Sequence, residues 1–301
     1  MLPAQEALDG FAVDLGGTKT AAARIARGGV VERVQSPTRG DADPEAQVDA
    51  MADLLARLGH RPGALLGVAV AGRIDGSGRW YAVNRGTLSA VFGFPLADVL
   101  RDRFGAIACL NDAAAAALAE ARFGSGAGAG NFAYLTISTG VGGGMVMDGR
   151  LVRSDNGLAG HVGFVSSGYA EAPCGSGREA TVESAAGGRA IAAAAAAAGH
   201  PAADARAVLV AAAAGADWAE RIVARSAGAV AALAADLAAV LGLDRIAVGG
   251  GIGLAPGYLD RVRAALVREP ALFQVPLAAA ALGHDAPLVG ALLSARMEDR
   301  S

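Results

Sequence analysis

Three glycine-rich segments stand out because each follows an apolar run typical of a buried strand. They are DLGGTKT at residues 14–20, STGVGGG at residues 138–144 and GGGI at residues 249–252. Glycine permits positive φ angles and lets backbone N–H groups come close to a bound anion. The segments are therefore candidates for phosphate binding, although ordinary tight turns in a chain with 43 glycines would look the same.

The side chains of these segments suit a nucleotide phosphate. Asp14 is suited to hold Mg²⁺ through water, while Thr18 and Lys19 offer a hydroxyl and an ammonium donor. Thr139 adds a hydroxyl in the second segment. Neither standard motif is present: the first segment lacks the GxxxxGK[ST] spacing, and Met145 stands where GxGxxG requires glycine. The prediction therefore rests on the three segments together.

An Asn111-Asp112 pair follows another apolar run, between the first two glycine segments. Phosphoryl transfer depends mainly on positioning and charge stabilisation, so a carboxylate beside the accepting hydroxyl suffices as general base. At its ordinary pKa of ~3.9, Asp112 would be ionised at neutral pH. Asn111 can both donate to and accept from sugar hydroxyls. Both residues also favour the cap of the alanine-rich helix that follows, so capping is the alternative interpretation.

The elements that must position these groups alternate between strand and helix, as in an α/β protein. Apolar runs closed by glycine turns predict strands over residues 11–25, 65–72, 106–112, 132–137, 145–152 and 245–252. Helical spacing and alanine content predict helices over 44–59, 112–123, 183–235 with an interruption near 199–201, 259–268 and 287–296. The second glycine hairpin repeats the plan of the first.

The segments occur in an order that resembles the ROK kinases, members of the actin-like ATPase superfamily. DLGGTKT, Asn111-Asp112, STGVGGG and IAVGGGIG carry the resemblance, which extends from Phe11 to about Arg296. It implies an α/β fold of the actin-like ATPase (ribonuclease H-like) type, with two lobes around a nucleotide and sugar cleft. The smaller lobe is expected over residues 1–115 and the larger over 116–285, with a helix over 286–301 returning to the first.

The same resemblance assigns roles to individual residues, with ATP and Mg²⁺ as cofactors and Asp112 as the catalytic base. The residues assigned to ATP and its phosphates are Asp14, Gly16, Gly17, Thr18, Lys19, Thr20, Thr139, Gly140, Gly142, Gly250 and Gly251. Those assigned to the sugar are Gly72, Arg73, Thr87, Asn111, Asp112, His161 and Glu183. In the family the first two turns hold the phosphates from opposite sides, and the third lies beside the adenosine.

His161 indicates a branch of the family. Most ROK sugar kinases carry glutamate at this position, whereas the bacterial N-acetylmannosamine kinases resemble this chain in having AGH. FGFPL at 92–96 and the run over 258–293 resemble the same branch. The implied function is ATP-dependent phosphorylation of the 6-hydroxyl of N-acetyl-D-mannosamine. The alternatives are a ROK glucokinase or N-acetylglucosamine kinase, and a sugar-binding member with little turnover.

The chain departs from the family at the structural zinc site. ROK proteins usually hold this zinc with a histidine and three cysteines, in a CxCGxxGCxE pattern. Cys174 is the only ligand that remains, because Phe164, Ser176 and Thr181 occupy the other three positions. One thiolate, a phenyl ring and two neutral hydroxyls do not complete a tetrahedral Zn²⁺ site. We therefore expect no structural zinc, and a loop before Glu183 that is shaped by packing.

Composition bears on partners and location. The net charge of −3, without a basic block, argues against nucleic acid and anionic membrane surfaces as partners. Two cysteines are too few for a disulfide framework, and the acidic N-terminus is unlike a signal peptide, so a cytoplasmic location is expected. The alanine-rich segments at 190–199 and 227–243 contain or adjoin polar residues and are not expected to span a membrane.

Ten residues precede Phe11, which argues against the helix-turn-helix of the ROK repressors. We expect a homodimer whose partners are the sugar and ATP.

Overall fold

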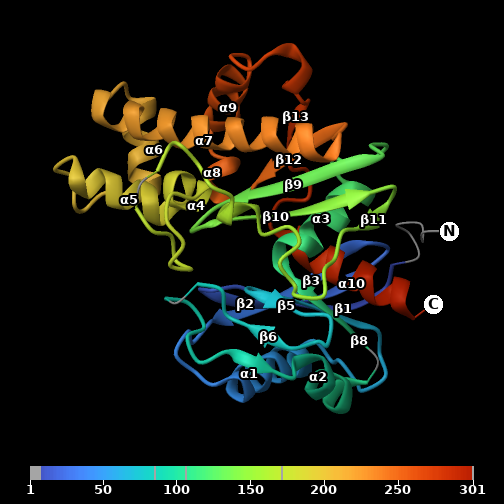
Figure 1. Cartoon of the computed structure of the whole chain (residues 1–301). Helices are drawn as coiled ribbons and strands as arrows, with labels where there is room; N and C mark the ends of the chain where they lie inside the picture. The colour runs from blue at the N-terminus through green and yellow to red at the C-terminus, as the bar shows by residue number, and fades with distance from the viewer. Residues whose placement is uncertain (1–7, 85, 106, 171, 300–301) are drawn as a thin grey trace.

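The chain folds into two halves with one repeated plan (Figure 1). The structure is a computed structural model that describes residues 8–84, 86–105, 107–170 and 172–299. The first sheet has the order β3-β2-β1-β4-β8 and the second β11-β10-β9-β12-β13. In each sheet the first hairpin is antiparallel and the following strands are parallel to its first strand. This confirms the predicted α/β architecture and the predicted repeat of the glycine hairpin.

The first half contains β1 (Gly10–Leu15), β2 (Lys19–Ala26), β3 (Gly29–Pro37), α1 (Pro44–Arg57), β4 (Leu66–Val70), β5 (Arg73–Ile74), β6 (Trp80–Tyr81), β7 (Phe92–Phe94), α2 (Leu96–Phe104) and β8 (Ile107–Asn111). Strand β4 is buried along its whole length, as its continuous apolar sequence predicts. Helix α1 starts at a cap in which the Asp43 carboxylate accepts from the N–H of Ala46 at 2.7 Å. Val48, Met51 and Leu54 then face the core.

The second half contains β9 (Asn131–Ile137), β10 (Val141–Met147), β11 (Arg150–Leu151), η2 (Val162–Phe164), α4 (Val182–Ala186), α5 (Gly188–Ala197), α6 (Ala205–Ala213), α7 (Asp217–Leu241), β12 (Arg245–Gly249), α8 (Gly250–Gly253), α9 (Tyr258–Leu266), η3 (Ala271–Phe273) and β13 (Leu277–Ala279). By length and composition α7 is apolar enough to cross a membrane, with a mean hydropathy of 1.5 over its most apolar window. Two-thirds of that window is buried, so α7 is the central helix of this half's core.

Three predictions of element boundaries were wrong. The strand expected over 245–252 ends at Gly249, and α8 begins at Gly250. The segment STGVGGG is not one turn, because β10 already begins at Val141 and its three glycines lie within the strand. A Cβ at Gly144 would lie 2.6 Å from the Cβ of Ala117, so glycine here admits a helix onto the sheet. The expected helical tract over 183–235 consists of four helices, since the chain also breaks at Gly187 and over 214–216.

Two helices lie between the sheets and join the halves: α3 (Asp112–Phe123) and α10 (Ala286–Glu298), which follows the turn η4 (Gly283–Asp285) (Figure 1). Helix α10 lies against β1, β4 and β8, whereas α3 lies against β9 and β10. The two helices pack closely on each other, and a Cβ at Gly290 would collide with the carbonyl of Ala115. Gly67 likewise leaves room for the backbone of α10 at Ala291.

A buried carboxylate fixes the far end of this joint. Glu120, near the end of α3, is fully buried and accepts hydrogen bonds from the N–H groups of Ser125 at 2.9 Å and Leu282 at 2.7 Å. A third comes from the N–H of Ala281 at 3.1 Å. Because a buried carboxylate is costly unless its oxygens are satisfied, these bonds hold α3 against the segment that leads into α10.

We expect Gly290→Ala to destabilise the protein, although alanine is the better helix former by about 1 kcal/mol. Its methyl group would overlap the Ala115 carbonyl and push α10 away from α3. The measurement is the urea midpoint of unfolding, which should fall. Gly168→Ala is the control, because a Cβ at Gly168 would meet no atom of the described residues within 4 Å. A midpoint for Gly290→Ala at or above that of the wild type would show that the contact is not tight.

Candidate active site

A cavity of about 390 Å³ lies between the two halves, and residues from both sheets and from the connecting loops line it. It gathers most of the residues that the sequence predicts as a site. They are Asp14, Gly16, Gly17, Thr18, Lys19, Gly72, Thr87, Asn111, Asp112, Thr139, Gly140, Gly142, His161 and Glu183. The first two glycine segments, one from each half, thus line the same cavity as Asp112. Binding by these residues remains a prediction.

Four of the predicted phosphate and sugar residues are not among those that line the cavity, and two of them, Arg73 and Thr20, have other side-chain contacts. Arg73 stacks its guanidinium on the ring of Tyr81, 3.8 Å from the ring centre, and donates to the carbonyl of Asn156 at 2.7 Å. Thr20 is buried in β2, and its hydroxyl contacts that of Thr38 at 2.9 Å. Arg73 therefore connects the segment around Tyr81 to the loop at Asn156. Thr20 supports the first turn through Thr38, whose hydroxyl bonds the carbonyl of Gly16.

The third glycine segment, with Gly250 and Gly251, is also outside this cavity. Gly250 has a φ of +83° and packs so closely on the carbonyl of Ile137 that a side chain would collide with it. The segment thus lies against the end of β9, from which the second segment continues. Around Gly251 there is open space.

The first turn connects β1 to β2 and is held by its own backbone. The N–H of Gly16 donates to the carbonyl of Lys19 at 3.0 Å, and the Thr38 hydroxyl donates to the carbonyl of Gly16 at 2.9 Å. Gly17 has no room for a side chain, because a Cβ there would lie 2.5 Å from the methyl group of Thr87. The turn is therefore shaped before any ligand arrives, with Asp14 at its base.

Asn111 and Asp112 lie where β8 ends and α3 begins. Asn111 is the N-cap of α3, since its Oδ1 accepts from the N–H of Ala114 at 3.1 Å, so the capping interpretation is correct for this residue. Its Nδ2 donates to the carbonyl of Gly72 at 2.8 Å and to Oδ1 of Asp112 at 2.9 Å. The N–H of Ala113 donates to the same Asp112 oxygen at 2.8 Å. The second carboxylate oxygen has no such bond among the described residues.

Burial sets the protonation of the two aspartates in the cleft. It raises the pKa of Asp112 to about 6, against the lowering effect of the donors from Ala113 and Asn111. It raises the pKa of Asp14 to about 7, with a further contribution from the Asp112 charge, and Arg33 and Lys19 oppose the shift. In the ligand-free protein, a negative charge at Asp14 is therefore poorly compensated by positive groups. This is expected of a carboxylate that binds a cation when the site is in use.

Glu183 touches the second turn. It lies in the first turn of α4, and its Oε2 accepts from the N–H of Val141 at 3.1 Å. A Cβ at Gly140 would collide with the same oxygen, so glycine is required for the carboxylate to sit here. The start of α4 is fixed by a capping box between Thr181 and Ser184, in which each side chain bonds the other's backbone N–H.

The loop before α4 keeps its shape through hydrogen bonds. The Cys174 thiol contacts the Ser176 hydroxyl at 3.0 Å, and isolated strand bridges join Ser166 to Thr181 and Pro173 to Glu179. Phe164 stacks on His161, with ring centres 6.0 Å apart. Among the described residues, no group of three His, Cys, Asp or Glu side chains is placed to share a metal ion.

His161 contributes a mostly buried imidazole to the lining of the cavity. Burial lowers its pKa, so the ring is neutral at physiological pH. Its Nδ1 is buried and has no hydrogen-bond partner within the described part of the chain. Backbone groups of Leu158, Ala159 and Gly72 partly offset that lowering of the pKa.

Several residues that line the cavity were not assigned a role from the sequence, among them Asn84, Arg189 and His284. Asn84 packs against Gly175 of the loop before α4, and Arg189 reaches Thr87 across the cleft. The Gly-Gly-Arg sequence at the start of α5 was an available signal, since paired glycines at a helix N-terminus permit close approach to another segment.

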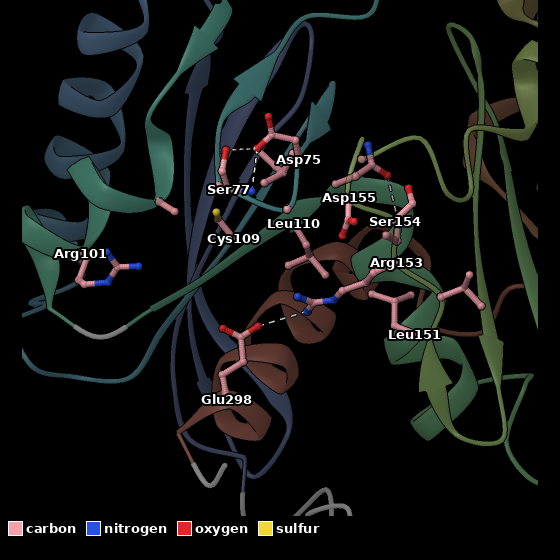
Figure 2. A pocket seen from close by; sticks show the side chains of 18 residues that line it. Asp75, Ser77, Arg101, Cys109, Leu110, Leu151, Arg153, Ser154, Asp155 and Glu298 are labelled. Atoms are coloured by element: carbon pink, nitrogen blue, oxygen red, sulfur yellow. Dashed lines mark hydrogen bonds and ion pairs between the residues drawn. The ribbon is translucent and has the colours of Figure 1, made fainter.

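A second cavity, of about 520 Å³, lies behind β8 and between α2, α10 and the loop after β11 (Figure 2). Its charged groups have local partners: Arg153 pairs with Glu298 at 3.2 Å, and Asp75 accepts from the Ser77 hydroxyl at 2.7 Å. Burial raises the pKa of the Cys109 thiol to about 12, so it is not a reactive thiolate. The described residues that line this cavity offer no set of groups for phosphoryl transfer.

The sequence profile of the ROK family matches residues 10–298, nearly the whole chain. The chain belongs to the ROK family. A curated relative, the N-acetylmannosamine kinase of Citrobacter koseri, is 42% identical over 288 residues, which cover 95% of this chain and 98% of that protein.

Solved ROK structures show the same fold. The ROK hexokinase from Thermus thermophilus matches with a TM-score of 0.82 and 32% identity, covering 97% of this chain and 99% of that one. A ROK glucokinase from Streptomyces griseus, in complex with glucose and AMPPNP, matches with a TM-score of 0.80 and 28% identity, covering 96% and 99%. The predicted actin-like ATPase fold is confirmed.

We expect Asp14→Asn to stabilise the ligand-free protein in a pH-dependent way. The folded-state pKa of about 7 exceeds the ordinary value of 3.8, so protonation of Asp14 favours the folded state. That contribution is complete below about pH 4 and is lost as pH rises through about 7. The gain in Tm over wild type should therefore grow between pH 4 and pH 8, reaching about 4 °C or more.

Asp53→Asn, at an exposed aspartate of α1, is the control. A gain independent of pH would contradict the burial of an uncompensated charge.

We expect the purified protein to contain no stoichiometric zinc. Chelators should leave its Tm unchanged, because the loop is held by the capping box and strand bridges. Cys174→Ser should also change Tm little, since serine can keep the contact with Ser176. Elemental analysis that finds about one tightly held zinc per chain would contradict this prediction.

Proposed function

We propose that this ROK protein transfers the γ-phosphoryl group of ATP to the 6-hydroxyl of N-acetyl-D-mannosamine. The observation that carries the proposal is one cavity that is lined by Asp112, by two glycine turns and by His161. Support for the substrate comes from relatives named N-acetylmannosamine kinase, 42% identical over 95% of the chain, and from histidine in place of the family's usual glutamate.

In the proposed reaction Asp112 accepts the proton of the sugar's 6-hydroxyl as its oxygen attacks the γ-phosphorus. The new O–P bond forms while the bond from that phosphorus to the ADP oxygen breaks, and ADP leaves. Asn111 and the N–H of Ala113 both bond to one carboxylate oxygen, which leaves the other to face the hydroxyl. His161 and Glu183 orient the sugar.

The residues around Asp14 fit a magnesium ion. Asp14 is a hard oxygen ligand beside the first turn, and its raised pKa reflects a charge that the protein leaves uncompensated. When bound, Mg²⁺ would neutralise phosphate charge. Lys19 and the N–H groups of the glycine turns would hold the phosphate oxygens.

We also propose two lobes that divide near residue 115, with α10 belonging to the first. Contacts of α10 with β1, β4 and β8 support that assignment. The ends of the expected lobes at residues 1 and 301 lie outside the described residues. Location in the cytoplasm and assembly as a homodimer stay predictions, and the two free cysteines fit a reducing compartment.

Asp112→Asn is expected to cut kcat by roughly 10²-fold or more while sugar binding persists. The asparagine oxygen can still accept from Ala113 and Asn111, so the local fold should hold. In the wild type, kcat/KM should fall as pH drops through about 6, because a protonated Asp112 cannot accept the proton. Steady-state kinetics and calorimetric sugar titration measure both effects. Near-native turnover in Asp112→Asn would remove Asp112 from this role.

His161→Ala should lower kcat/KM for N-acetylmannosamine roughly 5- to 150-fold. This fold-change corresponds to about 1–3 kcal/mol of lost hydrogen bonding in the transition state. Neutral imidazole offers one donor and one acceptor, which glutamine can imitate, so His161→Gln should recover part of the loss. Replacement by glutamate should shift preference toward glucose-type sugars. If His161→Ala acts on N-acetylmannosamine as well as wild type does, His161 is structural and the substrate becomes an unspecified hexose.

A further inference from the structure

Arg189 connects the two glycine turns of the cleft. Its backbone N–H donates to the carbonyl of Thr139, in the second turn, at 3.1 Å. Its side chain crosses to the first half, where Nη2 donates to the hydroxyl of Thr87 at 2.7 Å. The methyl group of Thr87 in turn lies directly against Gly17 of the first turn. The backbone of Arg189 is thus fixed to the second turn, while its guanidinium is held next to the first turn.

The backbone of Arg189 is fixed because α5 begins on the second turn. The N–H of Gly188, the first residue of α5, donates to the carbonyl of Ser138 at 2.8 Å. A Cβ at Gly188 would lie 2.8 Å from the same carbonyl oxygen, so the approach is close. The side chain of Arg189 itself is exposed to the cleft. Its direction therefore follows from the fold, whereas its tip remains free to change partner.

The charge balance of the cavity gives this arginine a function. Among the described residues that line the cavity, Lys19 and Arg189 are the only lysine or arginine, and they face Asp14, Asp112 and Glu183. A nucleotide triphosphate brings further negative charge into the same space. Lys19 supplies one cation from the first turn, and Arg189 supplies the other from the opposite half.

We propose that Arg189 is a phosphate clamp, whose guanidinium leaves Thr87 when ATP binds and contacts the terminal phosphate from the side opposite Lys19. The choice of ATP rests on the proposed function. A planar guanidinium can bond two phosphate oxygens at once, and a cation supplied at the transferring phosphoryl group can contribute strongly to kcat. The Thr87 hydroxyl is its resting partner in the ligand-free protein.

The competing explanation is that Arg189 is only a strut that keeps the two halves at a set distance through Thr87. The two explanations differ for Thr87→Val. If Arg189 is a strut, this variant should reproduce the loss seen for Arg189→Met. If Arg189 is a clamp, removal of the Thr87 hydroxyl frees the guanidinium, and affinity for a triphosphate should hold or rise.

The test compares Arg189→Met, Arg189→Lys, Thr87→Val and the control Arg221→Met in the full chain. Arg221 is an exposed arginine of α7 and is not among the residues that line the cleft or the pocket beside Arg189, so its substitution makes the same charge change elsewhere. Calorimetry measures binding of AMPPNP and of AMP without sugar. Steady-state kinetics with saturating ATP and N-acetylmannosamine then measures kcat.

We expect Arg189→Met to weaken AMPPNP binding about 10-fold or more, to change AMP binding less than about 2-fold and to lower kcat by about 10²–10³-fold. Arg189→Lys should keep part of the AMPPNP affinity, and Arg221→Met should match the wild type. Equal losses for AMP and AMPPNP, no loss for either, or the same AMPPNP loss in Thr87→Val would each overturn the clamp. The binding comparison holds whichever sugar is the substrate, so failure of the proposed function is seen separately, as a wild type without activity on N-acetylmannosamine.

Discussion

The close approach of α10 to α3 is the constraint on which the site depends. Gly290 and Gly67 leave room for backbone contacts that a side chain would prevent, and the alanines of α3 let it lie flat on the glycines of β10. One pair of helices thereby connects both sheets. Asp112 is the first residue of α3 and follows the last strand of the first sheet, so its carboxylate lies between the halves. Its place in the cleft is a consequence of how the halves are joined.

The ligand-free protein does not balance the negative charge of its cleft. Burial raises the pKa values of Asp14 and Asp112, and Glu183 adds a third carboxylate to the same cavity. Such an arrangement lowers the stability of the folded state at neutral pH, which is common where function requires a strained or charged site. A cation, a nucleotide and the two cationic side chains of the cleft would complete the balance.

Local patterns predicted much of this structure because they report local physics. Continuous apolar runs predicted β4 and β8, and the residue types of Asn111 and Asp112 predicted both the cap of α3 and a carboxylate in the cleft. Sequence could not show that Gly142 to Gly144 belong to a strand, since the reason is the helix packed on it. It also could not show that Arg73 has Tyr81 as a partner, or that Arg189 crosses the cleft, because both depend on segments brought together only by folding.

The loop before Glu183 holds its shape through hydrogen bonds between its own residues. Thr181 caps α4, and the Ser176 hydroxyl contacts the Cys174 thiol. The central claim is that this cleft phosphorylates N-acetylmannosamine. It is tested most directly by ADP release from the wild type with ATP, Mg²⁺ and each of N-acetylmannosamine, N-acetylglucosamine, mannose and glucose. Our account predicts the highest kcat/KM with N-acetylmannosamine and a product phosphorylated at the 6-hydroxyl, whereas a higher kcat/KM with any of the other three sugars would contradict it.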